Sequence, residues 1–236
     1  NYFIRFFLKN KHKHLIKNSY LTICGNNFLA NYAKKAGCKN IKILPSVINY
    51  SRYKKIKIYS SNDVPTITWI GQKSTTKNLY ILKTVFQKLA LEKKFILKII
   101  GSGDFSIKGV EIIKKEWSED NEIMELLNSD IGIMPLIRNR FAYGKCGYKL
   151  VQYMGAGIPV VASNFGANKK IVIHGENGFL ANTKSEWFYY LKTLIEDNEL
   201  RKKLGELGKR IVKEKFSVES SEKTFISFFQ INNSRK

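Results

Sequence analysis

Short apolar runs alternate with amphipathic segments from Pro65 onward, and this alternation restricts the fold more than any other feature of the sequence. The runs are rich in Ile and Val and lie at 66–70, 95–100, 110–113, 131–134 and 159–163. Continuous apolar runs are typical of strands buried on both faces, because a half-exposed strand would alternate polar and apolar residues. The sequence therefore predicts an α/β fold with a parallel sheet that helices cover on both faces.

The segments between and after these runs have the spacing of helices. Ser118 precedes a run that opens with acidic residues, which is typical of an N-cap and of the first helical turn. The predicted helices cover 78–91, the segment after Ser118, 149–154, the segment after Ser185, 198–215 and 217–231.

The chain before Pro65 is organised differently. An apolar run at 20–24, a helical segment at 26–35 and a strand at 41–45 predict a small piece of α/β structure. Residues 49–64 are polar and basic without an apolar period, which predicts a linker. The predicted organisation is therefore an N-terminal piece (1–48), a linker (49–64), a main domain (65–215) and a C-terminal helix (216–236).

The formal net charge of +22 comes mainly from lysine, because only seven of the 41 basic residues are arginine. Nucleic-acid readers favour the planar arginine fork, so no nucleic acid is expected as a partner. We interpret the charge as a compositional bias toward lysine, with weak attraction to an anionic membrane surface as the alternative.

Cysteine usage and hydropathy bear on the compartment. The three cysteines have neither metal-ligand spacing nor the even number of a disulfide framework, which favours a reducing cytoplasm. No apolar run approaches the roughly 18 residues that span a bilayer, and the first residues lack the pattern of a signal peptide. Because the sequence does not begin with Met, we expect a chain that starts within a longer protein or comes from a truncated gene.

Ligands of open parallel sheets bind at the carboxyl ends of strands, where helix N-termini present free N–H groups. The loop 71–78 follows a predicted strand; Gly71 permits close backbone approach, and Lys73 and Lys77 can place ammonium groups beside a phosphate. The Gly-Lys-Ser/Thr ending of a P-loop is absent, and an ordinary turn with solvated lysines is the alternative. The loop 101–104 lacks the third glycine of a dinucleotide fingerprint and is interpreted as a tight turn.

A third loop precedes the predicted helix at 149–154. Gly147 leaves the amides of the first helical turn open, and Lys145 and Lys149 are four residues apart, hence neighbours on one helix face. Two ammonium groups so close repel each other unless an anion lies between them, which suits a diphosphate. The alternative is a solvated basic helix end.

These motifs together resemble the donor domain of family 4 glycosyltransferases, the retaining enzymes of the GT-B class. The resemblance extends over about residues 20–230 and is carried by motifs in the family's order at 130–136, 144–157, 159–163, Gly166 and 175–180. It implies that 65–215 is a Rossmann-like, nucleotide-sugar-binding domain. It also implies that 1–48 is the last part of an acceptor domain, toward which the helix at 216–236 returns.

The resemblance implies a hexosyl- or related glycosyltransferase with a UDP- or GDP-linked donor and a glycan or lipid-linked acceptor. A place in surface polysaccharide or cell-envelope glycan synthesis is expected, at the inner face of the membrane. No metal or other cofactor is expected, because lysines can balance the charge of the diphosphate, and no catalytic residue is assigned. The expected diphosphate-binding residues are Gly71, Lys73, Lys77, Lys145, Gly147 and Lys149.

The chain departs from the family's pattern at four positions. Gln72 stands where the family usually has Arg, and Asn78 where it has Gly. The family's two glutamates, eight residues apart, correspond to Gly144 and Gln152. Gln152 is expected to bind the ribose hydroxyls in place of a carboxylate, whereas Gly144 leaves the donor sugar without its usual partner.

Three alternatives stay open at this point. The chain can be a truncated, non-catalytic remnant, a basic nucleic-acid-binding module, or a related sugar-nucleotide epimerase, although the last would need acidic and histidine residues that we do not find. Asp104 and Asp130 are expected to be structural and His174 to lie at the surface. The isolated chain is expected to transfer little sugar, because its acceptor lobe is incomplete.

Overall fold

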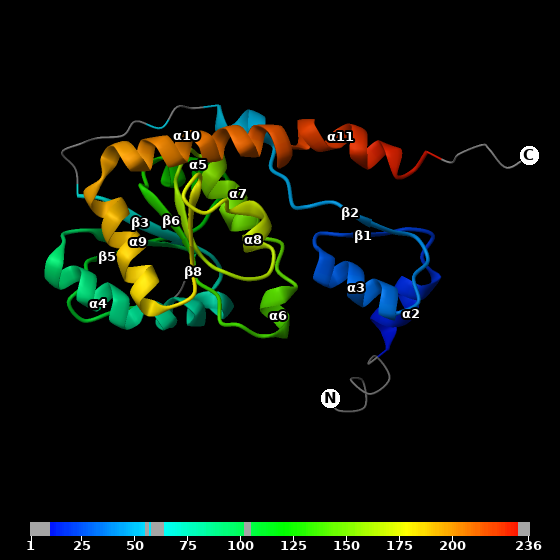
Figure 1. The fold of residues 1–236 in the computed structure, drawn as a ribbon, viewed down its shortest axis with the longest axis horizontal. Helices are drawn as coiled ribbons and strands as arrows, with labels where there is room; N and C mark the ends of the chain where they lie inside the picture. The colour runs from blue at the N-terminus through cyan, green and yellow to red at the C-terminus, as the bar shows by residue number, and fades with distance from the viewer. Residues whose placement is uncertain (1–9, 55–56, 58–63, 102–104, 231–236) are drawn as a thin grey trace, which may run out of the picture.

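The computed structural model describes residues 10–54, 57, 64–101 and 105–230. Two lobes of unequal size lie along the long axis of the molecule (Figure 1). The larger lobe contains a six-stranded sheet, and the smaller contains a two-stranded sheet with two helices. No helix among these residues has the length and apolar character that crossing a membrane requires.

All six strands of the large sheet are parallel, in the order β5-β4-β3-β6-β7-β8. They are β3 (Thr66–Ile70), β4 (Ile96–Ile100), β5 (Ile112–Lys115), β6 (Ile131–Met134), β7 (Val160–Ser163) and β8 (Gly178–Ala181). The chain moves outward from β3 to β5, returns to the centre at β6, and then moves outward on the other side. The strand order therefore reverses between β3 and β6, and the predicted parallel α/β sheet is confirmed.

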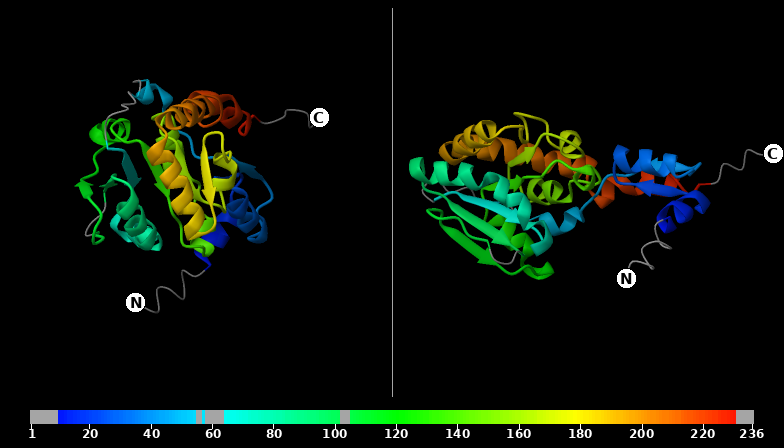
Figure 2. Two further views of the ribbon diagram at one scale, coloured as in Figure 1. Left: turned by 60° about the vertical axis from the view of Figure 1, so that its left-hand side comes forward. Right: turned by 90° about the horizontal axis from the view of Figure 1, so that it is seen from below.

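Helices cover both faces of this sheet (Figure 2). The helical segments are η2 (Lys73–Leu82, a 3-10 helix), α4 (Lys83–Glu92), α5 (Glu119–Leu127), α6 (Arg140–Tyr143), α7 (Tyr148–Gly155), α8 (Asn168–Ile171), α9 (Lys184–Glu196), α10 (Asn198–Lys215) and α11 (Val218–Ser227). On one face Trp69 of β3 lies in a core cluster with Phe86 of α4 and Leu191 of α9. On the other face Ile70 of β3 lies in a core cluster with Leu126 of α5 and Leu150 of α7.

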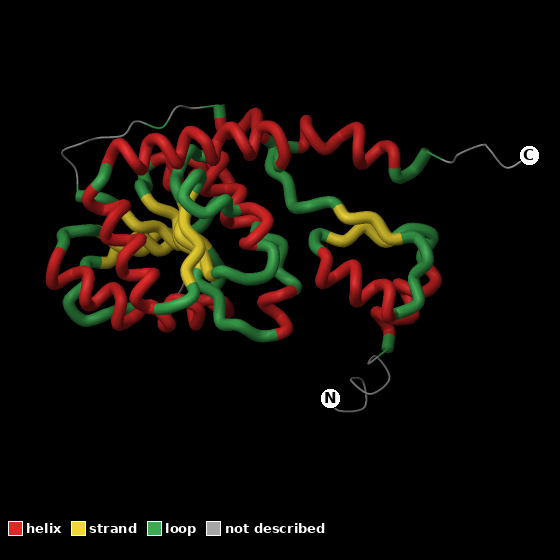
Figure 3. Tube along the Cα trace, in the orientation of Figure 1, coloured by secondary structure: helices red, strands yellow, loops and turns green. Residues whose placement is uncertain are grey.

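The small lobe consists of helices beside a two-stranded sheet (Figure 3). Its core contains Cys24, Ala33 and Cys38. Its elements are α2 (Lys11–Asn18), β1 (Thr22–Cys24), α3 (Asn27–Lys35) and β2 (Ile41–Ile43), with the 3-10 turn η1 (Tyr50–Tyr53) after it, and β1 and β2 pair in parallel. The chain passes between the lobes twice at one place. Ile48 N–H donates to Phe216 O (3.0 Å), and Val218 N–H donates to Ile48 O (2.9 Å), after which α11 runs alongside the small lobe.

Two segments differ from the sequence prediction. A helix was predicted from Asn78, but a 3-10 helix already begins at Lys73. The reason is that the buried Asn78 amide donates to Thr75 O and accepts from Ile137 N–H, each at 2.9 Å, which fastens this segment to the end of β6. The third run forms a strand at 112–115 instead of 110–113, because Val110 N–H closes a turn onto Ile107 O.

The predicted linker at 49–64 is attached to the large lobe in its described part. Tyr53 and Lys57 are buried, and Lys57 Nζ donates to Leu127 O (3.0 Å) and pairs with Asp130 (3.3 Å). Burial lowers the pKa of Lys57 despite this pairing. Asp130 also accepts from Thr66 N–H (2.9 Å), so this carboxylate fastens the linker to the start of β3.

Candidate functional site

The candidate site lies at the carboxyl edge of the large sheet, where the strand order reverses. Neighbouring strands whose connections leave in opposite directions form a crevice at this edge. Gly71 follows β3 directly, and the chain from β6 leads through α6 into α7. A Cβ atom added to Gly71 would run into the ammonium of Lys149 on α7. The loops 71–78 and 144–149, which the sequence analysis singled out, therefore meet.

Gly147 sets the start of α7. It is the N-cap, with a left-handed φ of 74°, and a Cβ atom here would run into Ile171. Glycine tolerates this conformation without strain, and it offers no side-chain oxygen to the first turn. The start of α7 therefore presents amide hydrogens and the positive end of the helix dipole toward the edge of the sheet.

Lys149 is the most perturbed cation of this edge. Its Nζ lies 4.2 Å from the centre of the Trp69 ring, beside Gly71. Although part of the side chain reaches the surface, burial of the ammonium lowers the pKa of Lys149 to about 7, and the charge of Lys145 contributes. Within the described residues no carboxylate forms an ion pair with it.

The other predicted lysines are placed differently. Lys145 lies near enough to act on Lys149 electrostatically, its Nζ lies 5.1 Å from the Phe141 ring centre, and burial lowers its pKa. Lys73 and Lys77 lie on η2 with exposed side chains, and no described contact joins either to Lys149. The structure thus brings together Gly71, Lys145, Gly147 and Lys149, but not Lys73 and Lys77.

Gln152 lies one turn after Lys149 on α7 and is buried, with 4% of its surface exposed. Its Nε2 donates to Glu122 Oε1 on α5 (2.7 Å), and Glu122 Oε2 accepts from Trp117 Nε1 (2.6 Å). A hydrogen bond also links Gln152 to the buried Tyr53. The expected ribose-binding residue therefore belongs to a polar group of four side chains, of which three are buried and Trp117 is half-exposed. The sequence analysis found only Gln152 among them.

Trp117 connects this group to the glycine turns. Gly101, after β4, has a left-handed φ of 74°, and a Cβ atom there would lie 2.8 Å from Gly71 O and 3.0 Å from Trp117 Cβ. The left-handed φ of Gly101 fits the tight turn expected at 101–104, but residues 102–104, with Asp104, lie outside the described residues, so the turn stays a prediction. The half-exposed indole of Trp117 therefore borders the same edge as Gly71.

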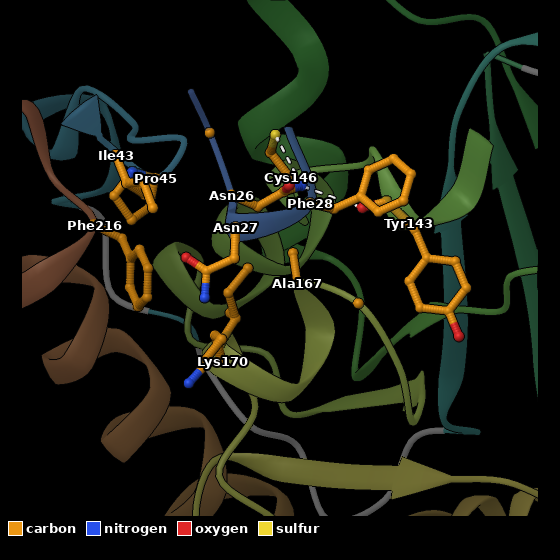
Figure 4. A pocket seen from close by; sticks show the side chains of 13 residues that line it. Asn26, Asn27, Phe28, Ile43, Pro45, Tyr143, Cys146, Ala167, Lys170 and Phe216 are labelled. Atoms are coloured by element: carbon orange, nitrogen blue, oxygen red, sulfur yellow. Dashed lines mark hydrogen bonds between the residues drawn. The ribbon is translucent and has the colours of Figure 1, made fainter. Parts of the chain in front are cut away.

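A cavity of about 440 Å³ lies between the lobes, next to the start of α7 (Figure 4). Asn26, Phe28, Tyr143, Cys146 and Lys170 are among its lining residues. The Asn26 amide joins the two lobes, because its oxygen accepts from Leu29 N–H (2.9 Å) at the start of α3 while its nitrogen donates to Tyr143 O (3.3 Å) and Lys145 O (3.0 Å). The loop that leads into α7 is thus attached to the small lobe.

Three further residues can be placed. Asp130 has the structural contacts described above, and exposed His174 accepts from Leu180 N–H at its Nδ1 (3.1 Å). Gly144 has an ordinary φ of −74°, and a Cβ atom there would make ordinary contacts, the nearest at 3.4 Å from Phe141 O. The backbone thus has room for a side chain where the family usually carries a glutamate.

The fold is that of the GT-B glycosyltransferases. HepE from Anabaena, in a crystal structure with UDP and glucose, has a TM-score of 0.74 at 17% identity, covering 94% of this chain and 66% of HepE. A sucrose-phosphate synthase from Thermosynechococcus elongatus has a TM-score of 0.71 at 14% identity, covering 92% of this chain and 59% of the synthase.

The sequence profile of glycosyl transferases group 1 matches residues 51–211, and the chain belongs to this family. It is 28% identical over 221 residues to an uncharacterized glycosyltransferase, MJ1178, of Methanocaldococcus jannaschii, covering 88% of this chain. It is 24% identical over 82 residues to spore coat protein SA of Bacillus subtilis, covering 34% of this chain. The chain spans 58% of the length of MJ1178 and 22% of that of spore coat protein SA.

Proposed function

We propose that this chain is the nucleotide-sugar-binding part of a glycosyltransferase, and that the donor's diphosphate binds between Gly71, the start of α7 and Lys149. The main support for this proposal is that the ammonium of Lys149 is buried and forms no ion pair with a carboxylate of the described residues. Burying an unpaired cation is costly. Such an arrangement favours a site that an anionic ligand completes, and the start of α7 adds N–H groups directed at an anion.

These groups have a direct role in glycosyl transfer. The bond between the anomeric carbon and the diphosphate oxygen breaks, and the acceptor hydroxyl oxygen forms the new bond to that carbon. Negative charge builds up on the leaving diphosphate oxygen, which takes up the proton of the acceptor hydroxyl. Fixed positive groups at that oxygen stabilise the transition state by about 3 kcal/mol for each well-placed donor. We assign this task to Lys149, Lys145 and the amides after Gly147, whereas the exposed Lys73 and Lys77 attract the diphosphate from the surface without contacting it.

The donor and acceptor are inferred more broadly. We infer a UDP- or GDP-linked donor; the solved HepE complex with UDP and glucose supports the first. The cavity between the lobes lies beside the start of α7, where a glycan or lipid-linked acceptor would meet the donor sugar. The order of the motifs supports a retaining reaction in surface polysaccharide or cell-envelope glycan synthesis. The cysteine usage favours a reducing cytoplasm, and the excess of lysine would suit weak attraction to an anionic membrane surface.

A thermal-shift comparison of UDP, GDP, the matching monophosphates and the nucleosides tests the proposal. A diphosphate at 100 times its Kd stabilises the fold by about 2.7 kcal/mol, which corresponds to an increase in Tm of about 5 to 11 °C. We expect that increase with at least one diphosphate, a smaller one with its monophosphate and little with its nucleoside. No shift with either diphosphate at millimolar concentration would contradict the proposal, and tight, steeply salt-dependent DNA binding instead would favour a nucleic-acid-binding module.

A truncated, non-catalytic remnant is the alternative, because neither Gly144 nor Gln152 supplies a carboxylate. Both interpretations allow nucleotide binding, so turnover separates them. The chain joined to a complete acceptor lobe of a close relative should release UDP or GDP from the sugar nucleotide that it binds most tightly. Binding without release in such a chimera would favour the remnant.

A further inference from the structure

We propose that Glu122 is a positioning residue that turns the amide oxygen of Gln152 toward the ribose of the bound nucleotide. The proposal rests on the function proposed above, and it assigns a role to a carboxylate outside the motifs that the sequence analysis identified.

The contacts of Glu122 determine how the Gln152 amide is oriented. Both partners of the carboxylate are nitrogen donors, Trp117 Nε1 at 2.6 Å and Gln152 Nε2 at 2.7 Å. A carboxylate only accepts, so Gln152 must direct its nitrogen, and not its oxygen, at Glu122. Glu122 is only 8% exposed and Gln152 only 4%, so water does not replace this bond easily.

Tyr53 also contacts this amide. Burial raises the pKa of Tyr53, and a hydrogen bond with Gln152 acts in the opposite direction. Because Nε2 is directed at Glu122, Oε1 points away from the carboxylate and keeps its capacity to accept. An amide oxygen has two lone pairs, so Oε1 can accept from a ligand hydroxyl beside any contact with Tyr53.

The position of this oxygen suits a ribose. Gln152 follows Lys149 by three residues, so the two side chains lie on one face of α7, about one turn or 5 Å apart along the axis. In a nucleoside diphosphate the ribose is joined directly to the phosphate chain. A diphosphate at Lys149 therefore brings a ribose hydroxyl within reach of Oε1, and Trp117, at the edge near Gly101, lies on the same side.

The variant Glu122→Gln tests this role with little change in shape. The new amide at position 122 can still accept from Trp117 through its oxygen, but its nitrogen then faces Gln152, whose amide must turn over. We expect UDP and GDP, whichever binds, to lose about threefold to tenfold in affinity. The matching 2′,3′-dideoxy diphosphates lack both hydroxyls and should bind the wild type and the variant equally well. Glu119→Gln, on the exposed side of α5, is the control and should change neither the affinity for the ribonucleotides nor that for the dideoxy analogues.

The double variant Glu122→Gln/Gln152→Glu supplies the rescue. It restores every hydrogen bond of the group with the carboxylate and amide exchanged, and it should recover the affinity for the ribonucleotides. Gln152→Glu alone places two carboxylates side by side, so its affinity for the ribonucleotides should stay below that of the double variant. Equal losses for ribo- and dideoxy-nucleotides, or no recovery in the exchanged pair, would overturn the role of Glu122 while leaving the diphosphate site intact. A wild type that binds neither UDP nor GDP would overturn the proposed function and this role with it.

Discussion

Lys149→Met removes the ammonium at the centre of the proposed site and keeps most of the side-chain volume. The wild-type lysine is pulled in two directions. Burial and the nearby charge of Lys145 disfavour its charged form, whereas a bound diphosphate would favour it. The substitution should therefore weaken ligand binding and stabilise the free protein at the same time.

The two magnitudes can be estimated separately. A hydrogen bond to a charged group contributes about 1.5 to 3 kcal/mol, so UDP or GDP should bind roughly 10- to 150-fold more weakly. One unit of pKa corresponds to about 1.4 kcal/mol. Because part of the side chain stays open to water, we expect a gain in stability of about 1 to 2 kcal/mol, or about 2 to 8 °C in Tm.

The effect of Lys149 on stability should change with pH in a direction that its pKa values determine. The pKa of Lys149 is about 7 in the folded chain and returns toward the ordinary value on unfolding. Between these two values the unfolded chain holds the additional proton, so the contribution of Lys149 to stability rises with pH. The gain from Lys149→Met should thus be full below pH 7 and fade toward about pH 10. Thermal melts at pH 6, 7.5 and 9 measure this trend.

Calorimetry provides the second assay. At pH 8 a group with a pKa near 7 is only about one-tenth protonated, so wild-type protein should take up as much as about 0.9 proton when a diphosphate binds. Titrations in two buffers of different ionisation enthalpy measure this uptake. Lys149→Met should abolish it, whereas Lys169→Met, on the exposed surface of α8, should retain it. Unchanged affinity and unchanged proton uptake in Lys149→Met would refute the reasoning.

Two further substitutions test the surroundings of Lys149. Gly147→Ala places a side chain at a left-handed φ and against Ile171, so the free energy of unfolding should fall by about 1 to 3 kcal/mol. A denaturant unfolding curve that matches the wild type would contradict this expectation. Lys77→Ala removes an exposed charge and should weaken diphosphate binding only about two- to fivefold. This effect should disappear at high salt, because salt screens exposed charges. A loss of affinity as large as that of Lys149→Met would instead show that Lys77 contacts the ligand.

The part of the site that follows from chain connectivity could be predicted from the sequence. Gly71 and Lys149 lie together because parallel strands place their carboxyl ends at one edge of the sheet. Glycines at the ends of the predicted strands and before the predicted helix indicated both loops in the sequence. The directions of Lys73 and Lys77 could not be predicted, because a lysine in a loop has no local signal for where its ammonium points. The 3-10 start of η2 depends on a bond between Asn78 and Ile137, 59 residues apart.

Glu122 is the clearest example of a site residue that the sequence alone does not predict. In the sequence it is one acid in the first turn of a helix, where acids are common because they suit the helix dipole. Its contact with Gln152 spans 30 residues and arises only when α5 and α7 lie side by side on the sheet. No spacing rule within either helix predicts that pair. The residue at position 152 was found because it stands in a motif, and its partner was missed because it does not.

The double crossing at Ile48 has a mechanical consequence. The outgoing and returning segments are joined there by the backbone bonds from Ile48 to Phe216 and from Val218 to Ile48. Because these bonds join the two segments at one place, we expect any relative rotation of the lobes to centre there. Widening the cavity would also have to break the bonds from the Asn26 amide to Tyr143 O and Lys145 O and the stacking of Phe28 on Tyr143.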